Sequence, residues 1–217
     1  MQVALENHHP NKEEQPTLTV PISHKEHQNI HGNIPIDTPL SNKMREYDKV
    51  NTILVTMKNW STAYQKDFGK APNIGLEHAV QLKKTLSKEL REFVQIELPK
   101  VKHIKGFGPR YLAGILAYAN PSRFPSLRKF LFYCGYKQAS RKKKRYCRRI
   151  KPIMYELVGQ IMKHKDPKYY PLYLKFKAEA KFKFQNKPKI KHHMIAINRT
   201  ATFMLKEIYQ IFGGKEN

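Results

Sequence analysis

Cysteine, long apolar runs and acidic residues are what this sequence has little of. Only two of its 217 residues are cysteine, Cys134 and Cys147, and no C-x-x-C or other metal-ligand spacing accompanies them. That excludes a disulfide framework and leaves two buried or idle thiols as the expectation. The longest apolar run, Leu112 to Ala119, is too short to span a bilayer, and the first residues show no basic-then-apolar signal pattern. We therefore expect a cytoplasmic protein with no membrane partner.

The shortage of acidic residues is confined to one half of the chain. Residues 1–99 contain 12 Lys or Arg and 12 Asp or Glu, whereas residues 100–217 contain 29 Lys or Arg and 5 Asp or Glu. The whole formal net charge of +24 therefore lies in the second half. Solubility alone does not require this segregation. A polyanion such as DNA explains it, because basic side chains set against phosphates release condensed counterions.

Large apolar residues are scarce in residues 1–40, which are polar, rich in histidine and interrupted by five prolines. Little apolar surface is available there to offset the entropy that ordering would cost, so we expect a disordered tail. The histidines follow no regular spacing, which favours a solvated tail over a metal site.

Residues 41–98 predict a helical hairpin or one arm of a coiled coil. Apolar residues from Tyr47 to Tyr64 recur at three- and four-residue steps, and a second such series runs from Ala79 to Phe93. The mixed charges of this segment fit either packing within the chain or homo-oligomerisation. The residues expected to start, break and stop its helices are Ser41, Gly69, Pro72 and Pro99.

Residues 99–217 predict further helices and no strand. Apolar residues recur with helical period at about 150–162 and 190–212, and an aromatic, lysine-rich segment lies between them at 169–184. The expected fold class is therefore all-α. It has a disordered tail (1–40), a helical hairpin (41–98) and a basic helical DNA-binding domain (99–217).

Residues 104–116 resemble a helix-hairpin-helix motif, in which two glycines flank an apolar residue before a helix. The glycines permit a tight turn and a close approach of the backbone to a ligand. The N–H groups of such a turn, and of the helix N-terminus after it, point toward an anion. A plain Gly-Pro helix start used for packing is the alternative, but the surrounding basic residues favour contact with the DNA backbone. The predicted contact residues are Lys105, Gly106, Phe107, Gly108 and Arg110.

A second candidate site is a run of basic residues, free of acidic ones, between 137 and 151. Tyr136 and Tyr146 interleave with it, either to stack on unpaired bases or to pack. A charge run is often a solvated face or a localisation signal, but the neighbouring segments are basic too, which favours a phosphate-binding strip. The predicted DNA-binding residues here are Lys137, Arg141, Lys142, Lys143, Lys144, Arg145, Arg148 and Arg149.

Several short segments occur in an order that matches a known family. They are the hairpin 104–109, Asn-Pro-Ser-Arg-Phe-Pro-Ser at 120–126, Leu-Phe-Tyr-Cys-Gly-Tyr at 131–136, 148–155, Tyr169 with Tyr173, and Asn-Lys-Pro-Lys-Ile-Lys at 186–191. Over residues 101–214 the chain thus resembles the C-terminal domain of DEDD-type insertion-sequence transposases, the group that includes the Piv-type DNA invertases. Each segment is short, and their order carries the resemblance.

The resemblance implies DNA transposition or site-specific recombination. In that family a RuvC-like domain binds divalent metal through acidic residues, a serine of the C-terminal domain is the nucleophile, and a structured RNA can guide target choice. Ser140 falls where that serine would be, although Arg141 replaces the glycine that usually follows it.

The N-terminal half departs from the family pattern. Asp37, Asp48 and Asp67 fall in a tail, a helix and a loop, whereas two-metal phosphoryl transfer needs several carboxylates held rigidly around the ions. No cofactor is visible, and Mg²⁺ would enter only if a partner supplied a catalytic domain. We therefore expect a nucleoid-associated DNA-binding derivative that lacks a complete catalytic domain. The alternatives are a basic structured-RNA-binding protein and an active recombinase that uses Ser140 and is completed by a partner.

Overall fold

The computed structural model describes residues 38–70, 75–137 and 146–213. Within these ranges the chain forms seven α-helices, two short 3-10 helices and no strand, which confirms the predicted all-α class. The α-helices are α2 (Pro39–Phe68), α3 (Glu77–Val94), α4 (Pro109–Ala119), α5 (Leu127–Tyr133), α6 (Ile150–His164), α7 (Tyr169–Lys183) and α8 (Lys189–Phe212). The 3-10 helices are η1 (Leu98–Val101) and η2 (Pro121–Arg123).

The first described helix, α2, begins earlier than predicted. Its N-cap is Thr38, whose hydroxyl accepts the Ser41 N–H at 3.1 Å, while the Ser41 hydroxyl accepts the Thr38 N–H at 3.1 Å. The prediction of Ser41 as the cap was therefore wrong: Ser41 is the third residue of a capping box, and Pro39 occupies the first turn. Gly69 ends the helix with a φ of +72°, as expected. The remaining predicted tail, 1–37, and Pro72 lie outside the described residues.

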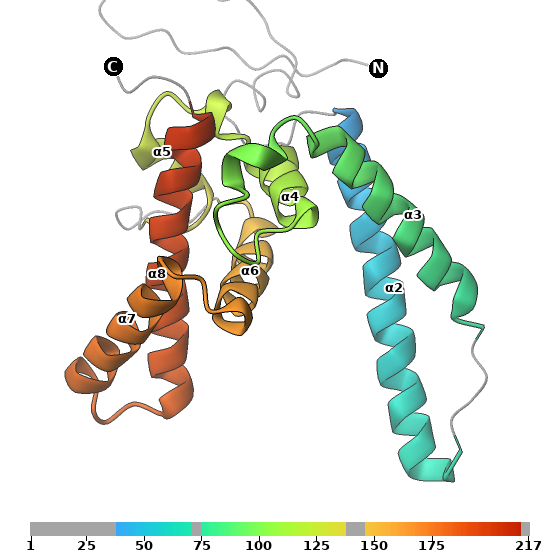
Figure 1. The fold of residues 1–217 in the computed structure, drawn as a ribbon. Coiled ribbons are helices and arrows are strands. Elements are labelled where there is room, and N and C mark those ends of the chain that lie inside the picture. Colours follow the sequence, from blue (N-terminus) through green and yellow to red (C-terminus); the bar gives the residue numbers. More distant parts are fainter. Residues whose placement is uncertain (1–37, 71–74, 138–145, 214–217) are drawn as a thin grey trace, which may run out of the picture.

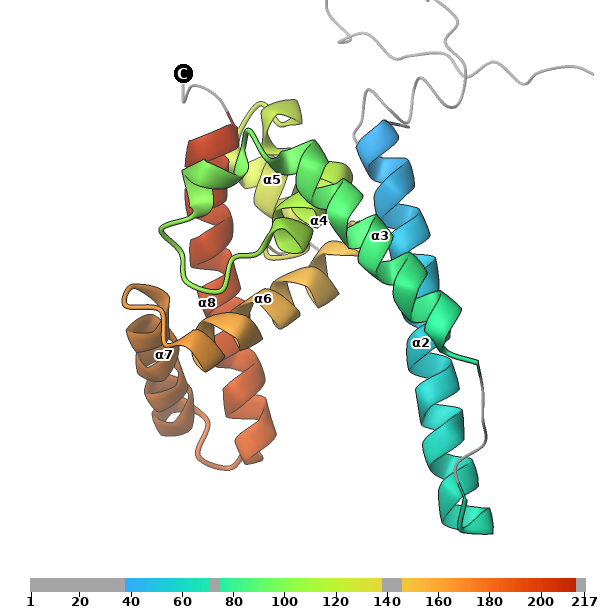
Figure 2. The same cartoon turned by 45° about the vertical axis from the view of Figure 1, so that its right-hand side comes forward.

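Helices α2 and α3 form the predicted hairpin, lying side by side, and α2 extends past α3 at the end away from the other helices (Figures 1 and 2). The near end of the hairpin packs on α4. Met44 and Leu90 there are buried in one hydrophobic core with residues of α4 to α8. The core thus runs across the predicted boundary at residue 98. Helix α3 ends at Val94, earlier than the predicted stop at Pro99, which lies in η1.

Helix α4 lies at the centre of the fold, and most of its residues are buried. It crosses α6 closely, because a Cβ on Gly114 would lie 2.7 Å from Ile153 Cδ1. The predicted apolar stripes of α6 and α8 face this core, with Leu157 and Leu205 fully buried. None of the described helices is long and apolar enough to cross a membrane.

Helices α7 and α8 form a second hairpin, with α7 packed along α8 (Figure 1). Two tyrosines one helical turn apart on α7 link it to α8. Tyr169 donates its hydroxyl proton to Glu207, and the Tyr173 hydroxyl lies 2.6 Å from His193 Nδ1. Arg199 of α8 bonds Glu179 of α7 at 2.5 Å. The tyrosine pair of the family-like segment at 169–173 therefore holds the hairpin together.

Candidate nucleic-acid interface

The glycine turn packs against α6. Gly106 has a φ of +91°, and a Cβ there would lie 3.1 Å from the backbone of Gln160. Both the conformation and the close approach therefore require glycine. Phe107 is buried in the core. The turn is built to bring the chain from η1 into α4 tightly against α6.

The turn does direct an N–H group at an anion, and that anion is Asp166. The Lys105 N–H donates to Asp166 Oδ2 at 2.7 Å. The other oxygen, Oδ1, accepts the N–H groups of Lys168 at 2.9 Å and Tyr169 at 2.8 Å. Asp166 is buried, so one carboxylate joins the glycine turn to the start of α7. This N–H group is thus already engaged within the chain.

The guanidinium of Arg110 is also engaged within the fold. It forms an ion pair with Glu156 of α6 at 2.7 Å and lies 5.2 Å from the centre of the Tyr47 ring of α2. Arg110 therefore ties α4 to both neighbouring helices. Of the five residues predicted as contacts in the turn, Lys105 is the one whose side chain is exposed.

Three of the DNA-binding residues predicted in the basic run are described, and all three are exposed: Lys137, Arg148 and Arg149. The others, Arg141, Lys142, Lys143, Lys144 and Arg145, lie outside the described residues, as does Ser140. The residues that flank the undescribed part are held together. A Cβ on Gly135 would lie 2.8 Å from the Tyr146 ring, and the Cys147 N–H donates to the Tyr133 carbonyl at 2.8 Å. The two ends of the run therefore lie next to each other.

Arg149 takes part in a polar chain that joins three helices. Its guanidinium donates to the Tyr118 hydroxyl at 2.9 Å, and that hydroxyl donates to Asp48 Oδ2 at 2.7 Å. Burial, and after it the hydrogen bond to Asp48, raises the pKa of the Tyr118 phenol. The phenol therefore stays protonated and acts as the donor to Asp48. Arg149 thus contributes to packing as well as to surface charge.

The four described acidic residues beyond residue 100 all have structural partners. Glu156 pairs with Arg110, and Asp166 accepts three backbone N–H groups. Glu179 pairs with Arg199, and Glu207 binds Tyr169, Lys168 and His103. These carboxylates are therefore not available to neutralise the many other lysines on the surface of this half.

The largest group of such lysines lies on the α7–α8 hairpin, and the sequence analysis assigned no site there. From Tyr169 to Lys191 the chain has seven lysines and one acidic residue, Glu179. All seven are exposed: Lys175, Lys177, Lys181, Lys183, Lys187, Lys189 and Lys191. No ion pair joins any of them to a carboxylate within the described ranges. The high ratio of lysine to acidic residues in this segment is the sequence signal that could have pointed to a binding site here.

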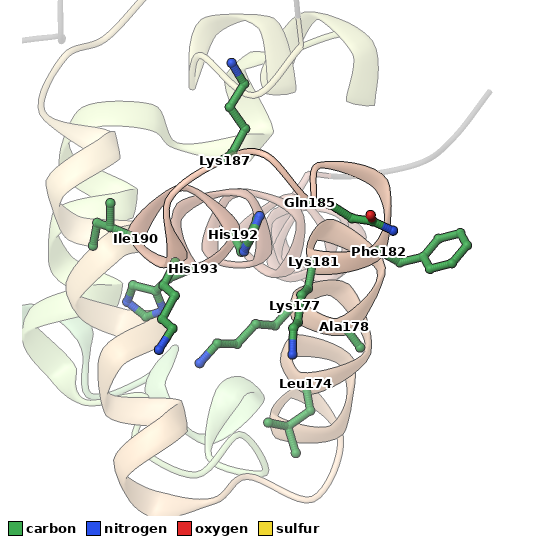
Figure 3. Close-up of a pocket in the computed structure, with 11 residues that line it drawn as sticks. Leu174, Lys177, Ala178, Lys181, Phe182, Gln185, Lys187, Ile190, His192 and His193 are labelled. Atoms are coloured by element: carbon green, nitrogen blue, oxygen red, sulfur yellow. The ribbon is translucent and has the colours of Figure 1, made fainter.

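A pocket of about 1090 Å³ lies between α7 and α8. Phe182 and Gln185 lie at one side of it, His193 and Ile190 at the other, and Lys177 with Lys181 between them (Figure 3). Its remaining lining residues are Leu174, Ala178, Lys187, Lys189 and His192. The pocket therefore combines apolar and cationic side chains.

The described carboxylates do not fit a two-metal centre. Among residues 38–70, 75–137 and 146–213, no group of three or more His, Cys, Asp or Glu side chains is placed to hold a metal ion. Asp48 bonds Tyr118 and lies 19 residues before Asp67 on α2, a separation of about 28 Å at the helical rise. Asp37 lies outside the described residues. Both cysteines are free thiols.

Comparison with protein-family models, with curated proteins and with solved structures finds no match. The resemblance of residues 101–214 to DEDD-type transposases therefore rests on the motifs alone and stays a prediction. What the chain can do has to be inferred from its charges, its contacts and its pocket.

Proposed function

We propose that this chain is a DNA-binding protein, related to transposases, whose C-terminal half binds the phosphate backbone. One observation carries the proposal. Each described acidic residue of this half already has a structural partner, while the seven lysines between Tyr169 and Lys191 are exposed and have no carboxylate partner among the described residues. Phosphates would neutralise these lysines, with release of condensed counterions.

Contacts of this kind bind DNA with little sequence preference, because lysine reads the backbone and not the base edges. A role in DNA transposition or recombination follows from the family resemblance. The described carboxylates give no metal centre for strand cleavage. The proposed activity is binding, and strand chemistry would need carboxylates beyond those of the described residues.

The α2–α3 hairpin supports self-association as part of the same proposal. Ile53, Trp60 and Phe68 of α2 are 52%, 53% and 67% exposed. Together with Met57 and Tyr64 they form a stripe at three- and four-residue steps, the spacing by which two helices pack along each other. Helix α2 carries five Lys or Arg and three Asp or Glu, a small net charge beside that of the C-terminal half, so repulsion between two copies along this stripe would be weak. The proposed occupant is therefore a second copy of the chain.

The test is binding of the full chain to labelled duplex DNA and to structured RNA across a salt series. The full chain is needed because the hydrophobic core joins the hairpin to the C-terminal half. We expect affinity for duplex DNA to fall steeply with salt. In Lys175→Gln/Lys183→Gln, the slope of log K against log salt should decrease by about 0.9 for each lost phosphate contact.

The matched control is Lys66→Gln/Lys70→Gln, which removes the same charge from exposed positions at the far end of α2. It should leave the slope unchanged. Affinity for duplex DNA that does not depend on salt, or an equal effect of both double variants, would contradict the proposal. Preferential binding of structured RNA would replace DNA by RNA as the partner.

A further inference from the structure

The pocket between α7 and α8 exposes apolar side chains in the middle of a cationic surface. Phe182 is 81% exposed, Ile190 63% and Leu174 46%. All three line the pocket. Apolar side chains in solvent cost free energy unless a ligand or a partner covers them. The helices themselves do not cover these residues, because α7 and α8 meet through Tyr173, Phe176 and Ala180, which are buried.

Among the described residues, the same pocket is lined by four lysines and by no acidic residue. Lys177 and Lys181 lie one turn apart on the C-terminal half of α7, Lys187 lies in the loop that joins α7 to α8, and Lys189 is the first residue of α8. Glu179, the one carboxylate of this segment, pairs with Arg199 and is not among the lining residues. Several closely placed cations without a counter-charge fit a ligand with more than one negative charge.

Hydrogen-bond donors and acceptors accompany the apolar and cationic groups. The His193 ring accepts the Tyr173 proton when its own proton lies on Nε2, and Nε2–H is then a donor at the pocket wall. Burial, and after it the charge of Lys177, lowers the pKa of His193, which favours the neutral ring. At the other side, the Gln185 amide lies next to Phe182 (Figure 3).

We propose that this pocket binds an unpaired nucleotide of a nucleic-acid strand, with the base against Phe182 and the adjoining phosphates on the lysines. The inference rests on the proposed function, because it assumes that the lysines of this half contact phosphates. An exposed aromatic ring stacks on the face of a base, and such a face is free only outside a duplex. Gln185, which lies beside Phe182, would then meet the edge of the base (Figure 3). A single-stranded segment is therefore the substrate class of this site.

An anionic lipid is the main chemical competitor, since it also joins an apolar part to a phosphate. The pocket favours the nucleotide on two counts. Four lysines suit the repeated phosphates of a strand better than one headgroup, and the amide and imidazole groups would have no partner on an acyl chain. Vesicles are accordingly included as a separate arm of the test.

The experiment measures binding of the full chain to four probes. A short oligothymidine strand, the matching oligouridine strand and duplex DNA are followed by fluorescence anisotropy, and phosphatidylserine vesicles by co-sedimentation. Phe182→Ala should weaken oligothymidine binding roughly 5- to 150-fold, the range found for loss of one stacked base, and leave duplex binding unchanged. Phe203→Ala is the matched control, because Phe203 is 44% exposed on α8 and is not a lining residue. It should have no effect on either probe.

A comparison of two double variants separates the effect of the pocket lysines from the effect of positive charge in general. Lys177→Gln/Lys181→Gln and Lys175→Gln/Lys183→Gln remove equal charge from the same helix, but only the first pair lines the pocket. The first should weaken oligothymidine binding more than the second. Equal losses for both pairs, or a Phe182→Ala variant that binds like the parent, would overturn the inference.

The remaining outcomes distinguish the pocket from the proposed function. If duplex binding depends on salt and Phe182 has no role in binding any probe, the pocket proposal is overturned and the proposed function stands. If oligothymidine binding needs Phe182 and duplex DNA does not bind, the pocket proposal is supported and the proposed binding of duplex DNA is contradicted. Tighter Phe182-dependent binding of oligouridine supports the pocket and identifies the strand as RNA. If phosphatidylserine vesicles bind in a Phe182-dependent way and oligothymidine does not bind, the nucleotide proposal is overturned and a lipid is the ligand.

Discussion

The two helical hairpins of this chain, α2–α3 and α7–α8, both expose apolar side chains, but they differ in the charge of the surface around them. The first leaves apolar side chains in solvent, with Trp60 53% and Phe68 67% exposed. The second exposes seven lysines with no carboxylate partner within the described ranges. Both hairpins are pairs of adjacent helices, so helix pairing alone does not explain the difference.

The difference lies in what holds each pair together. Apolar residues of α3 such as Leu86 and Leu90 pack against α2 in the core, so further apolar residues of α2 remain for another partner. Besides apolar packing through Phe176 and Ala180, polar links join α7 to α8, from Tyr169 to Glu207 and from Arg199 to Glu179. The acidic residues of this hairpin are engaged in these links, whereas its lysines have no carboxylate partner among the described residues. One hairpin is therefore suited to a protein partner and the other to a polyanion.

The largest expected effect comes from the residue that joins the α7–α8 hairpin to the rest of the fold. Asp166→Ala removes a buried carboxylate that accepts three backbone N–H groups, and it leaves those donors without a partner. We expect a loss of roughly 3 kcal/mol in the free energy of unfolding, measured by urea denaturation. Asp67→Ala, at an exposed position near the end of α2, should change it by less than about 0.5 kcal/mol. Similar values for the two variants would show that Asp166 is not a structural junction.

The second-largest expected effect concerns self-association through the apolar surface of α2–α3. Trp60→Asp places a charge in the exposed stripe and should weaken self-association by about 2 kcal/mol, roughly thirtyfold in the dissociation constant. Sedimentation velocity over a concentration series measures it. Phe182→Asp introduces the same charge at an exposed aromatic position of the other hairpin and should not affect association. A parent chain that is monomeric at all concentrations would remove the proposed role of this hairpin.

The helices could be predicted from sequence because their apolar residues repeat with helical period, and the helix stop at Gly69 follows from local chemistry. The position of the first cap was missed, because Thr38 and Ser41 are both good capping residues and the reciprocal bonds between them decide which one caps. Local signals place a helix end only to within a few residues.

The partners of the glycine turn could not be predicted. Its geometry was read correctly as able to bind an anion, but the anion is Asp166, 61 residues further along the chain. Likewise Arg110 looked like a phosphate contact and instead pairs with Glu156. Lysines such as Lys177 and Lys181 resemble any solvated helix face until α8 closes the other wall of the pocket. In each case, the glycine turn, Arg110 and the pocket lysines, the role depends on contacts between distant segments. Those contacts cannot be read from composition or local pattern.

The smallest expected effect is an acid sensitivity specific to the α7–α8 hairpin. Burial alone would raise the pKa of Glu207, but hydrogen bonds from Lys168, Tyr169 and His103 outweigh burial and lower this pKa from 4.5 to about 2. Because the folded value lies below the unfolded one, the stability that this carboxylate contributes is present above pH 4.5 and is lost as the pH falls toward 2.

In Glu207→Gln this contribution is absent at every pH. The variant should therefore be less stable than the parent at neutral pH, and the difference between them should shrink as the pH falls below about 4.5, as followed by urea denaturation at several pH values. Glu46→Gln on α2 is the control, since its carboxylate forms an exposed i,i+3 pair with Lys43, a kind of pair that contributes little. A difference for Glu207→Gln that stays constant with pH would mean that packing, and not the charge of Glu207, holds α7 to α8. The two hairpins would then differ in surface chemistry alone.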